Sequence, residues 1–127
     1  INAFFPETLQ HQRNIGNAHE MFIRFFSSVL IIPFLETAFF QVLIIEGLSS
    51  LKIKMILAVI VSAACFSILH SIYDVVYMFA VFPAGLIFAY YYYILRTEDK
   101  IMAFLSVSGL HATVNLLALV NNYFLIR

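Results

Sequence analysis

The chain has 127 residues, of which 63% are hydrophobic and 11% are charged, and its mean hydropathy is +0.96. Soluble domains average roughly 45–50% apolar and about 25% charged residues, so this composition excludes an ordinary water-soluble domain. Seven basic and seven acidic residues give a formal net charge of zero, which excludes the basic surface typical of nucleic-acid binding. We expect an integral membrane protein whose surroundings are lipid, with no nucleic acid as partner.

The first 22 residues mix charged and polar side chains with only a few apolar ones. Such a composition is typical of a polar surface segment or a short interfacial helix. The segment lacks the basic-then-apolar order of a signal peptide, and the chain begins with isoleucine. We therefore expect a core fragment of a larger helical membrane protein, with further helices upstream.

Four apolar stretches follow, and each has about the 20 residues that a helix needs to cross a membrane. They are residues 23–47, 53–73, 75–95 and 101–126. Backbone groups in lipid must be paired within their own segment, which favours helices over strands. The breaks near Gly47, near Asp74 and from Arg96 to Lys100 are short, so neighbouring helices must run antiparallel. The sequence predicts an all-α bundle of about four transmembrane helices formed by residues 23–127.

Two local features are expected to shape these helices. Pro33 lies within the first stretch and Pro83 within the third, where each removes a backbone donor and should kink its helix. Four consecutive tyrosines, Tyr90 to Tyr93, precede Arg96. Amphipathic rings beside a positive charge are typical of the membrane boundary, so we predict an interfacial aromatic belt there.

Three ionisable residues are expected inside the bilayer: Glu36, His70 and His111. Such a residue at the bilayer centre costs at least about 2.5 kcal/mol, so it normally faces the bundle interior and serves a function. Phe66 and His70 are four residues apart and share a helical face, as do His111 and Asn115. Each polar residue alone also fits a packing role through a hydrogen bond to a neighbouring helix. Together they supply a base, a proton carrier and a donor, which indicates a site.

These residues resemble the signature of the CPBP family of intramembrane proteases. The segments are ETAFFQ from Glu36 to Gln41, FSILH from Phe66 to His70, and HATVN from His111 to Asn115. The family includes type II CAAX prenyl endopeptidases and bacterial Abi proteins linked to bacteriocin processing and self-immunity. Its members carry the motifs EExxxR, FxxxH and HxxxN. The resemblance covers about residues 28–118.

Two positions of the first motif differ from the family pattern, and two residues outside the three motifs match it. Thr37 stands where a second glutamate is usual, and Gln41 stands where an arginine is usual. Replacing an acid and a base together by neutral residues removes an ion pair that is expensive to bury. Phe82 and Gly85 match a phenylalanine and a glycine that the family carries on an intervening helix.

The resemblance implies hydrolysis by an activated water rather than through a covalent acyl-enzyme. Glu36 would act as general base, and His70 would help to hold the water. His111 and Asn115 would donate hydrogen bonds to the oxyanion. Three further residues would support the site: Thr37, Gln41 and Phe66. The expected substrate is a peptide or a prenylated or other lipidated protein, in the plasma membrane of a bacterium or an archaeon.

Three alternatives remain open at the level of the sequence. Glu36, His70 and His111 would suit a zinc ion, but there is no HExxH motif, so we expect no cofactor and keep Zn²⁺ as the alternative. A non-catalytic immunity or scaffold protein with a degenerate motif would share the fold. A transporter or channel fragment would use intramembrane acids and histidines to relay protons.

Overall fold

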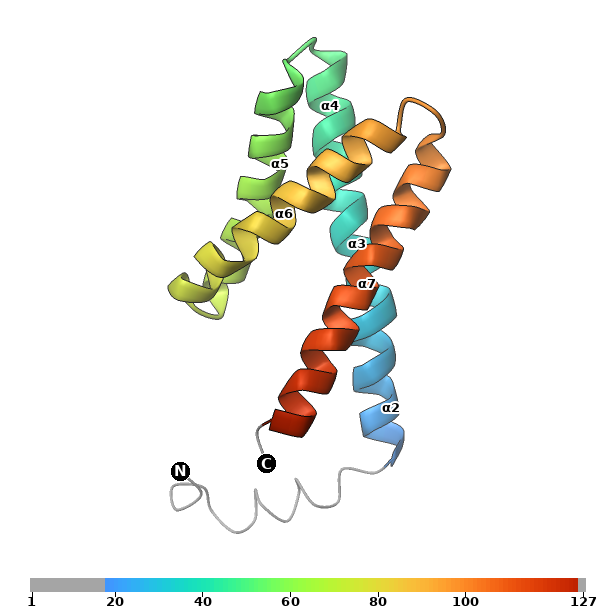
Figure 1. Cartoon of the computed structure of the whole chain (residues 1–127), viewed down its shortest axis with the longest axis vertical. Coiled ribbons are helices and arrows are strands. Elements are labelled where there is room, and N and C mark those ends of the chain that lie inside the picture. Colours follow the sequence, from blue (N-terminus) through green and yellow to red (C-terminus); the bar gives the residue numbers. More distant parts are fainter. Residues whose placement is uncertain (1–17, 126–127) are drawn as a thin grey trace.

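The computed structural model describes residues 18–125, and within them every regular element is a helix (Figure 1). The α-helices are α2 (Ala18–Phe26), α3 (Ile32–Glu36), α4 (Ile44–Ser50), α5 (Met55–Leu69), α6 (Val75–Leu95) and α7 (Lys100–Leu125). Between them lie the π-helical segments η2 (Ser27–Ile31) and η3 (Thr37–Leu43) and the 3-10 turn η4 (His70–Ile72). The predicted all-α class is confirmed. The predicted boundary at residue 22 stays a prediction, since most of that polar segment lies outside the described residues.

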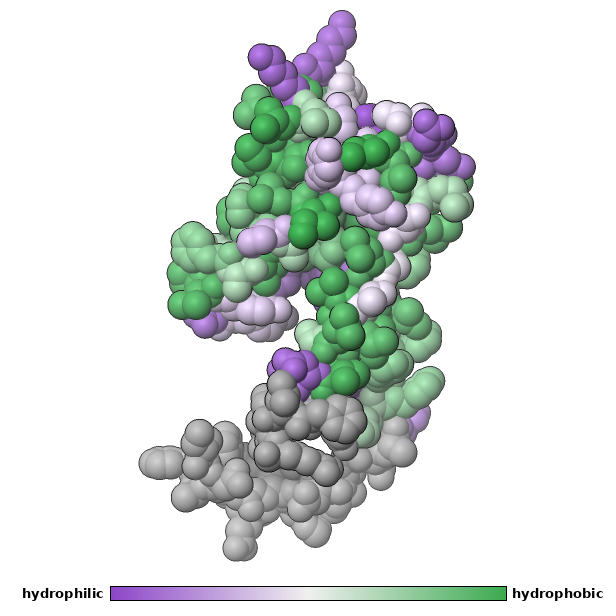
Figure 2. Space-filling view, in the orientation of Figure 1, coloured by the Kyte–Doolittle hydropathy of each residue, from purple (hydrophilic) through white to green (hydrophobic). Residues whose placement is uncertain are grey.

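Four helical stretches are long and apolar enough to cross a membrane, as predicted. They are His19–Ser50, Met55–Ile72, Val75–Leu95 and Lys100–Asn122. The first has 32 residues. At 1.5 Å per residue it is about 48 Å long, so in a hydrocarbon core of about 30 Å it tilts or projects beyond it. Figure 2 shows apolar side chains covering the helices and hydrophilic ones gathered at the end that holds the α4–α5 and α6–α7 loops. The chain is an integral membrane protein.

The first long helix, from α2 to α4, lies beside α7 and runs antiparallel to it, whereas α5 and α6 form a second antiparallel pair (Figure 1). Two contacts fix the register between the first helix and α7. Near one end, Asn115 Nδ2 donates to the carbonyl of Ser28 at 3.0 Å. Near the other, Lys100 Nζ lies 2.9 Å from Glu46 Oε2. Between these two contacts, each position on the first helix can therefore be matched to a position on α7.

The first helix departs from α geometry around Pro33. Proline has no N–H, and its ring collides with the carbonyl four residues back. The turn before it is π-helical, and Ile32 N–H bonds to the carbonyl of Ser27, five residues back. A second π segment, η3, begins directly after Glu36. Such segments are rare and frequent at functional sites. By contrast, α6 continues through Pro83 as one α-helix.

The core forms where α5 and α6 cross closely. A Cβ added at Gly85 of α6 would lie 3.2 Å from Ala63 Cα of α5 and 2.9 Å from Phe66 Cδ1. Small residues let membrane helices approach in this way. The buried core residues are Ile45, Val59, Phe66, Phe88, Ala89, Tyr92, Ala103 and Val107. The close crossing therefore packs the Phe66 ring in the middle of the bundle.

The predicted tyrosine belt is wrong for one of its members. Tyr92 is fully buried, because four consecutive helical residues sample all sides of a helix and one of them must face inward. Its hydroxyl donates to Glu46 Oε1 at 3.0 Å. Arg96 donates to both oxygens of Glu46, from Nε at 2.7 Å and from a terminal nitrogen at 3.2 Å. This bond raises the pKa of the Arg96 guanidinium. The cluster ties α4, α6 and α7 together at one end of the bundle.

Candidate active site

The carboxylate of Glu36 lies between two histidines from other parts of the chain. Glu36 ends α3, where the helix changes into η3. His111 Nε2 on α7 lies 3.1 Å from Glu36 Oε2, and His70 Nε2 in η4 lies 3.9 Å from Glu36 Oε1. The side chains of Glu36, His70 and His111 are 15%, 12% and 3% exposed. The structure thus brings the three ionisable residues together in a nearly closed site.

The hydrogen bond that His70 makes with the backbone assigns the tautomer of its neutral ring. Its Nδ1 lies 2.8 Å from the carbonyl of Phe66, which only accepts hydrogen bonds, so we assign the hydrogen of the neutral ring to Nδ1. The lone pair of Nε2 then faces Glu36 Oε1. A distance of 3.9 Å is too long for a direct hydrogen bond and suits a bridging water. A water there would donate one hydrogen to each residue.

His70 lies near the end of the second membrane-spanning stretch, Met55–Ile72, just beyond α5. α5 ends at Leu69, and His70 begins the turn that leads to α6. The 3-10 turn His70–Ile72 follows, and the side chain of Asp74 then accepts a hydrogen bond from Val76 N–H and so caps the start of α6. The shared face of Phe66 and His70 nevertheless holds, since their ring centroids are 4.8 Å apart.

His111 has the opposite arrangement of its ring nitrogens. Its Nε2 is within hydrogen-bonding distance of a carboxylate oxygen, so the hydrogen of the neutral ring belongs on Nε2. Its buried Nδ1 has no hydrogen-bond partner in the part of the chain that the structure describes. The ring packs against Phe88 at 4.6 Å and Phe66 at 5.4 Å between centroids. Each histidine therefore offers Glu36 a different function, an acceptor from His70 and a donor from His111.

Phe66 separates and orients the two histidine rings. It is 2% exposed, and its ring contacts those of both histidines as well as Phe40 and Phe88. The sequence suggested only that an aromatic residue walls one side of the site. In the structure one ring fixes the position of both imidazoles.

Asn115 is placed differently from the other predicted site residues. Its Nδ2 donates to the carbonyl of Ser28 in η2, which holds α7 against the first helix. In the described part of the chain no hydrogen bond joins it to Glu36. A carboxamide has two N–H hydrogens, so a role as oxyanion donor rests on the second one.

Thr37 and Gln41, the two departures from the family pattern, are fully buried. Among residues 18–125 neither side chain has a hydrogen-bond partner, and the same is true of Ser108 on α7. The sequence analysis missed Ser108. Its signal was its place three residues before His111, on the same helical face.

In residues 18–125 there is no group of three or more His, Cys, Asp and Glu side chains placed to hold a metal ion. We therefore derive no chemical step through a metal.

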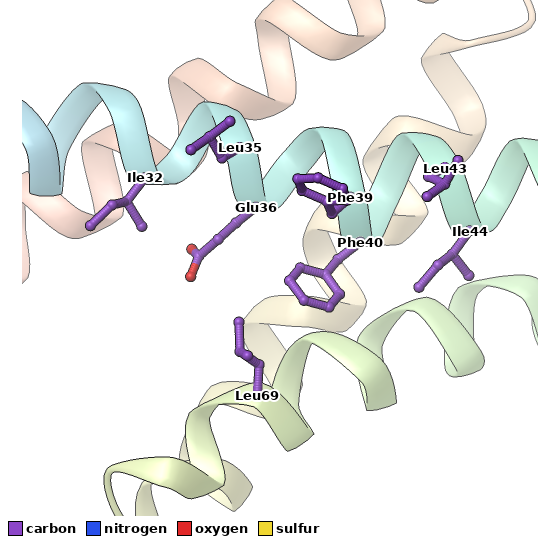
Figure 3. A pocket seen from close by; sticks show the side chains of 8 residues that line it. All are labelled: Ile32, Leu35, Glu36, Phe39, Phe40, Leu43, Ile44 and Leu69. Carbon is purple, nitrogen blue, oxygen red and sulfur yellow. The ribbon is translucent and has the colours of Figure 1, made fainter.

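An apolar groove leads to Glu36 on the outer side of the first helix (Figure 3). It has a volume of about 490 Å³ and is lined by Ile32, Leu35, Glu36, Phe39, Phe40, Leu43, Ile44 and Leu69. Glu36 is the ionisable residue of this lining, and every other lining residue is apolar (Figure 3). Leu35, Phe39 and Leu43 are more than half exposed, so the groove faces the lipid side of the bundle.

Replacing Gly85 with alanine should lower both stability and any activity of the site. The new methyl group would meet Ala63 backbone and the Phe66 ring, and overpacking of this kind costs about 1–3 kcal/mol. A displaced Phe66 would in turn move His70 and His111. We expect a lower midpoint of thermal unfolding, and at least about a tenfold loss of activity from a misplaced catalytic group. Gly47→Ala is the matched control, because no atom lies within 4 Å of its added Cβ. Equal behaviour of the two variants would contradict this reading of the crossing.

Comparison with known proteins agrees with the motifs. A family model described as type II CAAX prenyl endopeptidase Rce1-like matches residues 18–117. This range includes Glu36, His70, His111 and Asn115. Searches of curated proteins and of solved structures give no match.

Proposed function

Because the chain belongs to the Rce1-like family of type II CAAX prenyl endopeptidases, we propose that it hydrolyses a peptide bond with a water activated by Glu36. At the level of the family it is a CAAX-type intramembrane protease. The observation that carries the proposal is the placement of the Glu36 carboxylate, with His111 Nε2 at 3.1 Å on one oxygen and His70 Nε2 at 3.9 Å on the other.

In the proposed reaction the water binds between Glu36 Oε1 and His70 Nε2. Both are acceptors, so the water donates its two hydrogens to them, and its lone pairs remain free to attack the scissile carbonyl. As the new C–O bond forms, one proton passes to Glu36. The same carboxyl then delivers that proton to the leaving amine as the C–N bond breaks. The second hydrogen of the water stays on the new carboxyl group, so the products are a carboxylic acid, which ionises on release, and an amine, with no covalent enzyme intermediate.

The negative oxygen that develops on the carbonyl needs donors. His111 Nε2–H donates to the carboxylate before the reaction and would turn to the oxyanion once Glu36 has taken the proton of the water. The second N–H of Asn115 is the proposed second donor. One such donor is worth about 3 kcal/mol in a site closed to water. The low exposure of His111 supports this role.

The substrate we propose is a prenylated or otherwise lipidated protein or peptide. The groove of Figure 3 is apolar along its length and carries one carboxylate, so a lipid chain in it would place an adjoining peptide bond near Glu36. A peptide of the bacteriocin type is the second candidate within the same chemistry. We propose the plasma membrane of a bacterium or an archaeon as the location.

A cleavage assay with the full-length chain in liposomes tests this proposal. The probe is a fluorescence-quenched CAAX peptide in farnesylated and unmodified forms. We expect cleavage with a kcat/KM at least about tenfold higher for the farnesylated form, since burial of each additional CH₂ contributes about 0.8 kcal/mol. Activity should persist with a zinc chelator. No cleavage of any peptide by a folded chain would contradict the proposal and favour a non-catalytic immunity or scaffold protein.

A further inference from the structure

Several buried polar atoms on η3 and α7 have no hydrogen-bond partner within residues 18–125. They are Thr37 Oγ1, Gln41 Nε2 and Oε1, Ser108 Oγ and His111 Nδ1. Thr37, Gln41 and Ser108 are 0% exposed and His111 is 3% exposed. Buried polar groups are nearly always paired, with the protein or with ordered water. Five such atoms on facing elements therefore indicate a bound partner.

The register of the two helices places these residues together. Thr37 lies nine residues from Ser28 and nine from Glu46, the two positions where the first helix touches Asn115 and Lys100 of α7. Counting nine residues along α7 from each contact puts Thr37 opposite residues 106 to 109, which include Ser108. Gln41 follows Thr37 in a buried stripe with a four-residue repeat: Val29, Pro33, Thr37, Gln41 and Ile45. The elements η3 and α7 contact each other directly.

The unprotonated nitrogen of the His111 ring needs a hydrogen-bond donor. With its hydrogen on Nε2 facing Glu36, the Nδ1 atom of the neutral ring is an acceptor. The hydroxyls of Thr37 and Ser108 and the amide of Gln41 can each give and receive hydrogen bonds, as water can. A water in a buried polar site typically makes two to four hydrogen bonds.

We propose that Thr37, Gln41 and Ser108 form a buried water-binding site whose water donates a hydrogen bond to His111 Nδ1. The water gives its second hydrogen to Gln41 Oε1 and accepts from the two hydroxyls. This bond keeps the hydrogen of His111 on Nε2, beside Glu36. The three residues are thus positioning residues for His111, and only their effect on the reaction rests on the proposed function.

Thermal unfolding of the full-length chain in detergent separates a water site from an unpaired cluster. Thr37→Val and Ser108→Ala each remove one hydroxyl with little change in shape. A water that loses an acceptor or donor is bound less well, so we expect both variants to unfold at a lower temperature. If the hydroxyls are simply unpaired, their removal should raise the midpoint, because unpaired buried polar groups destabilise the fold. That result would overturn the proposal. Thr113→Val is the matched control, an exposed threonine whose hydroxyl bonds to its own helix at Gly109.

Nitrogen NMR on the chain labelled at its four histidines gives a readout that needs no protease activity. The His111 signals are assigned by their loss in His111→Gln. We expect the Nε2–H form in the wild type and a mixture of both forms in Gln41→Leu and Ser108→Ala. In an active preparation these variants should lower kcat about tenfold with little change in KM, and Thr37→Ser should keep the wild-type value. An Nδ1–H form in the wild type would refute the water site even where cleavage is intact. The expected form without cleavage would refute the proposed function alone.

Discussion

Replacing Glu36 with glutamine should abolish peptide cleavage and leave the fold intact. The amide has nearly the shape of the carboxyl group, and its oxygen can still accept from His111 Nε2–H, which lies 3.1 Å from Oε2 in the wild type. It cannot take a proton from water. General acid–base catalysis contributes about 10²–10⁴-fold, and here one group serves as both base and acid. We expect kcat to fall by at least about 10³-fold, measured as product formed from the farnesylated peptide.

The matched control is Glu20→Gln on the same long helix. Glu20 is exposed in α2, away from both histidines, so the same chemical change there should leave kcat within about twofold. Circular dichroism and thermal unfolding of both variants show whether the bundle is intact. Cleavage by a folded Glu36→Gln chain at more than a few per cent of the wild-type rate would remove Glu36 from its proposed role.

The helical spans follow from the sequence because lipid imposes a simple rule. A segment that cannot hydrogen-bond to its surroundings must be helical, and about 20 apolar residues are enough to cross. The ends of helices depend on local polar contacts that this rule ignores. His70 shows the difference: α5 ends just before it, a 3-10 turn follows, and Asp74 caps the start of α6. Glu46 shows it too, because its partners Tyr92 and Arg96 lie far along the chain.

The membership of the site was predictable in part for a different reason. An i,i+4 spacing determines which side chains share a face of one helix, as for Phe66 and His70. It says nothing about which face of another helix they meet. The contacts of Glu36 with His70 and His111, and the burial of Ser108 opposite Thr37, depend on the antiparallel register between helices. The π segment after Glu36 also changes which side of the helix the following residues face. No residue pattern in the sequence predicts this segment.

The activity of a His111 variant should depend on whether the new side chain supplies an N–H donor. His111→Leu keeps an apolar side chain of moderate size between Phe66 and Phe88 but removes the donor beside Glu36. Loss of one oxyanion donor costs about 10²–10³-fold in kcat, and we expect that loss with KM changed by less than about threefold. His111→Gln places an amide N–H near the position of Nε2 and should recover activity to within about tenfold of the wild type.

The comparison separates three roles for the same ring. A residue that only fills space would give similar rates for leucine and glutamine, provided that both variants unfold near the wild-type temperature. A residue that binds substrate equally in the ground and transition states would raise KM and leave kcat unchanged. Only a residue that donates to the developing oxyanion would give a lower kcat with leucine, recovery of kcat with glutamine and an unchanged KM. His19→Leu on the exposed side of α2 is the control for removing a histidine without touching Glu36. Because His111 is 3% exposed and its Nε2 lies 3.1 Å from the carboxylate, we expect the third pattern.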